Sequence, residues 1–336
     1  MDRWAQLDED ERFRIALDVA RRRGRDLSRL STNIIGVGAG YRLRGAEPER
    51  VSEVCIRFLV RQKWQDRRAR ASRIPDHIVA YPLIGDRRVR VRIPTDVSDL
   101  SAGSPHAALD LTGGLVSRHK GTPQSYGSAC CAVSSASNPA HKYLLSCHHV
   151  FSPTMSATLP RQVDCIVSDS GQRIGPLVVA ASTRGPLAMD AALVRIEDED
   201  IDTLSMWGRW PVSRATDFDL SVLHQRGPLF VLCRQQVPAV DGQPPELRTQ
   251  ALEVRFVGVT FHPIVFDYRS IAGKRFSFGY TIQYVGALRP GDSGAALIDT
   301  GGMLYGMHFF GQGSLGFAVA APRLFESAAF GFDIVL

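Results

Sequence analysis

The chain has 336 residues, which is enough for two or three compact units that each have a hydrophobic core. Hydrophobic residues make up 44% and charged residues 22% of the sequence, a composition that is typical of globular proteins and excludes a disordered chain. The net charge is +6, and no stretch approaches the ~20 apolar residues of a membrane-spanning helix, so we expect no membrane partner.

The N-terminus and the cysteines both indicate a cytoplasmic protein. Residues 1–11 are acidic where a signal peptide would be basic and then apolar. No C-x-x-C pair or zinc-type spacing occurs, so we expect buried free thiols, no metal and no cofactor. The alternative for Cys147, which precedes the histidine pair, is a thiol that is sensitive to oxidation. The six cysteines are Cys55, Cys130, Cys131, Cys147, Cys165 and Cys233.

The first predicted unit, residues 1–31, is an N-terminal helix. Apolar residues recur near the 3.6-residue period over residues 8–31, and acidic residues at the start suit the helix dipole. Gly24 is the one position that weakens this prediction, because glycine lowers helix stability.

A small α+β domain is predicted for residues 32–105. A glycine-rich strand over 33–43 precedes a strand over 54–61 with period-two alternation. A charged, partly helical connection over 62–73 follows, and then a strand over 88–93 that Pro94 ends.

Basic residues concentrate in this first part of the chain. Residues 1–100 hold 22 Lys and Arg against 15 Asp and Glu, whereas the remainder holds 18 against 19. An anion-facing surface for nucleic acid or an acidic partner is one interpretation, and a solvated or intramolecular face is the other. The residues concerned are Arg57, Arg61, Lys63, Arg67, Arg68, Arg70, Arg73, Arg87, Arg88, Arg90 and Arg92.

Beyond a short polar linker over 98–106, the chain carries three motifs that suit acyl-transfer chemistry. An apolar strand over 144–147 runs into His148 and His149, and Asp190 precedes a buried-strand pattern. Ser293 lies in a Gly-Asp-Ser-Gly run, where Gly291 lets the N–H groups of Gly291 and Ser293 point at one oxyanion. The tetrapeptide alone also fits a surface turn.

The order His, Asp, Ser resembles that of the chymotrypsin-like serine proteases over residues 113–336. The resemblance implies a mainly β fold with two barrels, over 113–200 and 217–320, a crossing segment over 201–218 and a C-terminal helix over 322–330. It favours His149 over His148 as the base, with Asp190 as its orienting acid and Ser293 as the nucleophile. No activation sequence is visible, so we expect no zymogen-type activation.

The N-terminal unit carries a second resemblance. Its Gly-Val-Gly-x-Gly-Tyr run, the Val-rich strand with Arg-x-Lys, and the Pro-Thr-Asp-Val near residue 97 are similar to a domain that precedes trypsin-like domains in a bacterial family and in the plant Narrow-leaf proteins. This resemblance covers about residues 32–100 and implies no catalytic residue.

Substrate specificity is predicted from the segment after the nucleophile. His308 lies in Gly-x-His-x-x-Gly, which resembles the pocket motif of bacterial glutamyl endopeptidases and picornaviral main proteases and implies cleavage after Glu or Gln. Leu288 stands where those families have a hydroxyl donor, and Ala287 leaves no acidic floor for Lys or Arg. A buried, backbone-satisfied histidine is the alternative. The other expected substrate-binding residues are Phe309, Phe310 and Gly311.

The sequence therefore predicts a cytoplasmic serine endopeptidase that acts on protein or peptide substrates, preceded by a regulatory or partner-docking module. Two alternatives remain open: a catalytically silent trypsin-like binding platform, and a protease that nucleic acid or a partner protein switches in a defence or death pathway.

Overall fold

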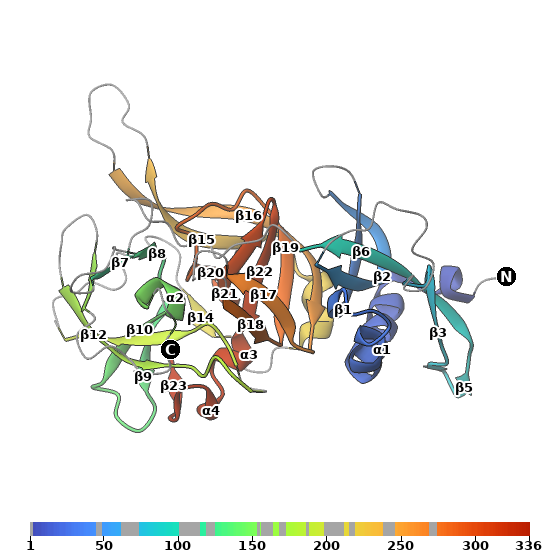
Figure 1. Ribbon diagram of the computed structural model, residues 1–336, viewed down its shortest axis with the longest axis horizontal. Helices are drawn as coiled ribbons and strands as arrows, with labels where there is room; N and C mark the ends of the chain where they lie inside the picture. The colour runs from blue at the N-terminus through green and yellow to red at the C-terminus, as the bar shows by residue number, and fades with distance from the viewer. Residues whose placement is uncertain are drawn as a thin grey trace.

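The computed structural model describes most of the chain as two β-barrels and an N-terminal unit (Figure 1). In Figure 1 the first barrel is green, the second is orange to red, and the N-terminal unit is blue to cyan. Among the described residues, no helix is long and apolar enough to cross a bilayer. The described residues are 3–44, 49–61, 74–100, 115–118, 125–152, 155, 164–167, 173–185, 188–197, 212–214, 219–237, 246–268 and 274–336.

The first barrel is a ring of antiparallel strands. The pairing runs β9-β10-β13-β12-β11-β7-β8, and residues 128–130 connect the last strand of this order, β8, back to the first, β9. A short C-terminal strand pairs with β9 from outside. The strands are β7 (Leu115–Arg118), β8 (Ser125–Gly127), β9 (Cys131–Ser135), β10 (Lys142–Ser146), β11 (Asp164–Val167), β12 (Arg173–Ala180), β13 (Ala192–Arg195) and β23 (Ile334–Val335).

The second barrel is closed by six strands in the order β15-β20-β21-β22-β19-β16, because β16 also pairs with β15. Strands β19, β21 and β22 are buried along almost their whole length, so both of their faces are covered. The expected two-barrel, mainly β fold is thus confirmed. The strands are β15 (Leu229–Val237), β16 (Glu246–Thr260), β19 (Thr281–Val285), β20 (Ala296–Asp299), β21 (Met303–Gln312) and β22 (Leu315–Ala320), with β14 (Ser213–Arg214) paired to β21.

A hairpin that the sequence did not reveal lies between β16 and β19. It consists of β17 (Ile264–Tyr268) and β18 (Lys274–Phe278), which pair only with each other. Four of its ten side chains are aromatic, and two of these, Phe266 and Phe278, are fully buried against β21 and β22. The hairpin is therefore an aromatic layer on the outside of the second barrel.

The long N-terminal helix agrees closely with its prediction. Helix α1 (Glu9–Ser28) begins after Asp8, whose carboxylate accepts a hydrogen bond from the N–H of Glu11. Gly24 is needed because a Cβ there would lie 2.4 Å from the His262 ring. The expected single helix at 322–330 is instead two single turns, α3 (Ala321–Leu324) and α4 (Ser327–Phe330). The other helices are η1 (Arg3–Gln6), α2 (His148–Phe151) and η3 (Leu220–Gln225).

The N-terminal strands continue the sheet of the second barrel. Strand β1 pairs with β2 on one side and with β16 on the other, through Ala39 opposite Val259 and Gly40 opposite Gly258. The division at residues 32–105 remains a prediction, but the hydrogen-bonded sheet crosses it. The strands are β1 (Ile34–Arg44), β2 (Glu49–Val60), β3 (His77–Ala80), β4 (Leu83–Ile84), β5 (Arg87–Arg88) and β6 (Val91–Asp99).

Two expectations for this unit need correction. Pro94 does not end its strand, because β6 pairs with β3 up to Pro94 and with β2 only from Thr95 onward, so β2 needs no N–H from the proline. Arg57 does not belong to a basic surface. It is fully buried, and its guanidinium donates to Gln283 of the second barrel at 2.8 Å and to Ser98 at 2.8 Å.

The remaining basic residues divide into two groups. Arg61, Arg87, Arg88, Arg90 and Arg92 are exposed. Lys63, Arg67, Arg68, Arg70 and Arg73 lie outside the described residues, as does most of the predicted linker and of the crossing segment.

The junction of β1 and β16 gives a stability prediction. A Cβ at Gly40 would lie 2.1 Å from the backbone oxygen of Val257, so Gly40→Ala forces the two backbones apart. We expect it to lower the free energy of unfolding by about 1–3 kcal/mol in urea denaturation. Gly227→Ala is the matched control, because nothing lies within 4 Å of its added Cβ. Equal stability of both variants would contradict the close approach.

Candidate active site

His149 and Asp190 are brought together by neighbouring strands of the first barrel. Strand β10 ends at Ser146 opposite Ala192 of β13, so the chain after β10 and the chain before β13 meet at the same edge. The backbone N–H of His149 donates to Asp190 Oδ1 at 3.1 Å, and its Nδ1 bonds to Oδ2. Both side chains are buried. The imidazole is thus held by the carboxylate with its Nε2 pointing away from it.

The Asp190 carboxylate stays ionised although it is fully buried. Burial alone would raise its pKa, but the His149 imidazole and hydrogen bonds from His149 and Tyr268 hold the pKa below its ordinary value of 3.8. The Tyr268 hydroxyl donates to Oδ2 at 2.6 Å. A charged acceptor is therefore available to the imidazole throughout the neutral pH range.

His148 has a different environment, although it is adjacent in sequence. It is buried, and neither ring nitrogen has a hydrogen-bond partner among the described residues. Burial lowers its pKa to about 4, which keeps the ring neutral. The carboxylate orients only His149.

Ser293 lies in a tight turn at the start of the strand pair β20–β21. Gly291 and Gly294 have φ values of 99° and 95°, which side-chain-bearing residues rarely adopt. The N–H of Asp292 donates to Arg289 O, and the N–H of Gly294 donates to His308 O at 2.8 Å. The turn therefore has a defined shape, as the Gly-Asp-Ser-Gly run predicts.

The first barrel holds this turn of the second barrel through Ser128. The N–H of Ser128 donates to Ser293 O at 2.7 Å, and its hydroxyl donates to Gly291 O at 2.9 Å. A Cβ at Gly294 would lie 1.9 Å from Ser128 O, so only glycine fits there. The seam between the barrels thus sets the position of Ser293.

Asp292 has a local backbone partner. Its carboxylate is buried and accepts a hydrogen bond from the N–H of Arg289 at 2.6 Å. A backbone donor thus satisfies this buried acid at least in part.

Ser293 and His149 are both buried, and the atoms that would react are not hydrogen-bonded. Ser293 is 0% exposed and His149 is 2% exposed. Within the described part of the chain, neither Ser293 Oγ nor His149 Nε2 has a hydrogen-bond partner. Hydrogen bonds between catalytic groups often tighten only when substrate binds, so the missing bond does not exclude Ser293 and His149 as partners.

His308 lies on β21, where it is fixed from three sides. Its backbone N–H donates to Ala295 O, and its backbone oxygen accepts from Gly294 N–H and from the Cys147 thiol at 3.2 Å. Its Nδ1 is 2.6 Å from the Tyr284 hydroxyl. Burial raises the pKa of Tyr284 well above its usual value, so the phenol keeps its proton.

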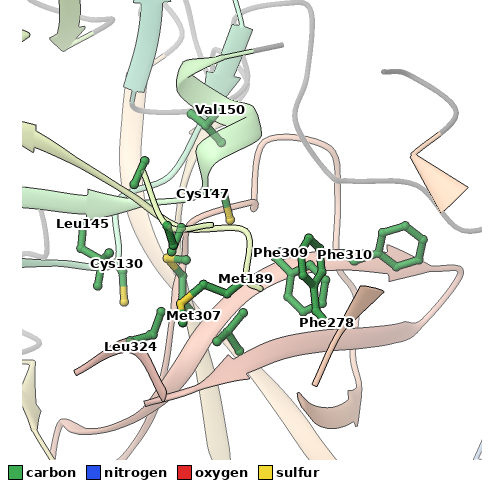
Figure 2. Close-up of a cluster of buried hydrophobic side chains, with 14 of the residues drawn as sticks. Cys130, Leu145, Cys147, Val150, Met189, Phe278, Met307, Phe309, Phe310 and Leu324 are labelled. Carbon is green, nitrogen blue, oxygen red and sulfur yellow. The ribbon is translucent and has the colours of Figure 1, made fainter. Parts of the chain in front are cut away.

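The other predicted pocket residues fall in different environments. Phe309, Phe310 and Gly311 are buried, and Figure 2 shows the two phenylalanines grouped with Phe278 of the hairpin. Phe266 lies 4.9 Å from each of them between ring centroids. Their contact with substrate remains a prediction.

Leu288 and Ala287 lie beside the pocket wall. Leu288 is half-buried, and a Cβ on Gly316 would meet Leu288 at 2.4 Å and Tyr284 at 2.6 Å. Leu288, Tyr284 and His308 therefore share one region, whereas Ala287 is exposed.

Comparison with known proteins decides the family. A model of the trypsin-like peptidase domain matches residues 127–307, which is more than half of the chain. The chain belongs to the trypsin-like peptidase family. It is accordingly a serine endopeptidase by family. No curated protein sequence is a significant match.

Solved structures with similar architecture are proteases at low identity. The active form of the Rv3671c protease from M. tuberculosis is 14% identical, covers 67% of this chain and 83% of its own, and has a TM-score of 0.35. A glutamic acid specific serine protease, described as using a novel histidine triad in substrate binding, is 16% identical. It covers 66% of this chain and 98% of its own, with a TM-score of 0.37. The HtrA-type protease AlgW with a decapeptide is 17% identical, covers 66% of this chain and 63% of its own, and has a TM-score of 0.33.

Three residues of this trypsin-like site escaped the sequence reasoning. Tyr268, Tyr284 and Ser128 lie 78, 24 and 165 residues from the groups that they bond, Asp190, His308 and Ser293. No local motif marks them, since each sits in a strand or loop of ordinary composition. Only the pairing of distant strands brings them to the site.

Cys147, His149 and Asp190 also have spacing that would suit a metal ion. Each donor is already engaged, because the Cys147 thiol donates to His308 O and Asp190 accepts from His149 and Tyr268. Burial raises the pKa of the Cys147 thiol well above its usual value, which disfavours a thiolate ligand. The cluster fits proton transfer better than metal binding.

Asp190→Asn tests the orientation of the imidazole. The amide keeps the shape of the side chain but favours the wrong tautomer of His149, so we expect kcat to fall on the order of 10⁴-fold with the fold intact. Because the pKa of Asp190 is depressed by folding, its stabilising effect is present above pH 3.8 and lost as pH falls through the lower folded value. The free energy of unfolding of the variant should therefore lack the pH dependence that ionised Asp190 contributes in acid. A kcat within tenfold of wild type would contradict the assignment.

Proposed function

We propose that the protein cleaves peptide bonds through Ser293, His149 and Asp190. Ser293 Oγ attacks the scissile carbonyl carbon while its proton passes to His149 Nε2, and the imidazolium then donates that proton to the leaving amine. Asp190 keeps the proton of His149 on Nδ1 and stabilises the imidazolium. The observation that carries the proposal is the carboxylate of Asp190, which accepts from both the backbone and the ring of His149.

The N–H groups of Gly291 and Ser293 are proposed to hold the oxyanion. The left-handed backbone at Gly291 turns the peptide plane at this position, and Ser128 anchors the carbonyl oxygens of Gly291 and Ser293 on the other side. A carbonyl held in this way fixes the turn before the reaction, which is the condition for electrostatic stabilisation without reorganisation.

A fluorophosphonate probe tests the nucleophile directly. We expect the full-length wild-type protein to be labelled covalently at Ser293 and Ser293→Ala to remain unlabelled, as measured by intact-protein mass spectrometry. Ser221→Ala is the matched control, because Ser221 lies in η3, outside the site. Absence of labelling in the wild type, with the fold intact, would favour the catalytically silent binding platform instead.

Cleavage after Glu or Gln is the proposed specificity. If the protonated Tyr284 hydroxyl donates to His308 Nδ1, the ring carries its own proton on Nε2, from which it can be donated to a carboxylate or amide oxygen. Leu288 beside Tyr284 supplies an apolar surface and no further donor. A medium-sized apolar residue before the cleaved bond is therefore the second choice. A Lys or Arg side chain would find no carboxylate among His308, Tyr284 and Leu288.

A mixed peptide library, read by mass spectrometry, tests this preference. His308→Val should reduce kcat/KM for Glu or Gln substrates by about 10–100-fold, with a smaller loss for apolar ones, because only the former lose a hydrogen bond. Tyr284→Phe should act in the same direction by a smaller factor. A wild-type profile dominated by Lys or Arg, or one unchanged in His308→Val, would refute the role of His308.

The N-terminal unit is proposed to be a regulatory or partner-docking module. Three contacts support coupling to the protease: β1 pairs with β16, Arg57 bonds Gln283, and His262 Nε2 lies 2.9 Å from the backbone oxygen of Arg21 in α1. We favour a protein partner over nucleic acid, since Arg57 is buried and contributes no charge to the basic surface. Buried free thiols at Cys55, Cys130, Cys131, Cys147 and Cys233 support a reducing compartment.

A further inference from the structure

The catalytic acid is bonded by a residue from outside both barrel rings. Tyr268 is the last residue of β17, in the hairpin inserted between β16 and β19. Its hydroxyl donates to Asp190 Oδ2 at 2.6 Å, and both side chains are fully buried. The same phenol ring lies edge-on to the His149 imidazole, with 5.7 Å between centroids and 78° between planes.

The aromatic layer of the hairpin fixes the Tyr268 ring. Its centroid lies 5.1 Å from that of Phe276, 6.2 Å from that of Phe278 and 5.8 Å from that of Phe310. A ring enclosed on several sides has one rotamer available, so its hydroxyl has a single position. The hairpin therefore presents a fixed hydrogen-bond donor to Asp190.

We propose that Tyr268 is a positioning residue, which orients the Asp190 carboxylate so that Oδ2 faces His149 Nδ1 and which stabilises its ionised form. This inference rests on the proposed role of Asp190 as the triad acid. Among the residues that the structure describes, the phenol supplies the one donor to the Asp190 side chain that does not come from His149. Without it, the carboxylate would be held only by the group that it is meant to orient.

The groups that face Asp190 limit what a pH profile can report. They are Cys147, His148 and His149 from the first barrel and Tyr268 from the hairpin. Burial raises the pKa of the Cys147 thiol and of the Tyr268 phenol well above their usual values, and it lowers the pKa of His148 to about 4. We therefore assign the acid limb, which is the rise of kcat/KM on the acid side of its pH profile, to the coupled pair of His149 and Asp190.

Tyr268→Phe removes the donor and keeps the ring. A donor to Asp190 favours the more negative states of the pair, so its loss raises the apparent pKa values of the pair and moves the acid limb to higher pH. We expect this shift together with a fall in kcat of about tenfold and little change in KM. A purely structural role would lower stability and leave the acid limb where it is.

Tyr305→Phe is the matched control. Tyr305 also has a buried ring in the second barrel, and its hydroxyl donates to Asp299 Oδ2 at 2.9 Å, away from the catalytic residues. We expect its acid limb and kcat to equal those of the wild type. An acid limb in Tyr268→Phe identical to that of the wild type, with the fold intact, would overturn the inference.

A double-mutant cycle covers the case in which Tyr268→Phe is unstable. In the Asp190→Asn background the acceptor is no longer a charged carboxylate, so adding Tyr268→Phe should lower kcat less than twofold further. A full tenfold further loss would overturn the inference. If the wild type is not labelled by the fluorophosphonate, the proposed function fails separately. The midpoint of the His149 NMR titration in ¹⁵N-labelled full-length protein then reports on Tyr268 without catalysis, and an unchanged midpoint in Tyr268→Phe would refute it.

Discussion

The buried charge of Asp190 is the constraint on which the rest of the site depends. An ionised carboxylate without water is costly unless several donors surround it, and here each donor comes from a different part of the structure than the acid itself. The N–H and ring of His149 come from α2, which starts one residue after β10, and the hydroxyl of Tyr268 comes from the hairpin. The first barrel, its first helical turn and an appendage of the second barrel must therefore be assembled together before the charge is satisfied.

The same logic applies to the seam between the barrels. Ser128 of the first barrel donates to two carbonyl groups of the Ser293 turn, and Cys147 of the first barrel donates to the backbone of His308. Gly294 allows this approach because it has no Cβ to collide with Ser128. Ser293 and His308 are thus tied to one interface, so a small rotation of one barrel against the other would disturb both.

The sequence predicted those elements whose signal is local. Helix α1 has its period and its Asp8 cap, and the turn at Ser293 needs the glycines on either side, whereas the strand predicted as half-buried at 54–60 is buried on both faces. The hairpin could not be predicted to be separate, because Ile264–Tyr268 and Lys274–Phe278 have the same composition as barrel strands. No local pattern predicts that β1 pairs with β16 or that buried Arg57 donates to Gln283, since both contacts involve residues more than 200 positions apart.

Burial of Ser293 sets a further requirement for catalysis. A polypeptide cannot reach a hydroxyl of 0% exposure, so some part of the cover must move before a peptide bond can be attacked. The hairpin is tied to two parts of the molecule: its aromatic side chains lie on Phe309 and Phe310, and the residues before it contact α1 through Phe261 and His262. Tyr280, which follows the hairpin, has a φ of 53°, a conformation that non-glycine residues rarely adopt. Since Tyr268 belongs to the same hairpin, any motion of the hairpin must either preserve the hydrogen bond to Asp190 or leave that buried carboxylate without it.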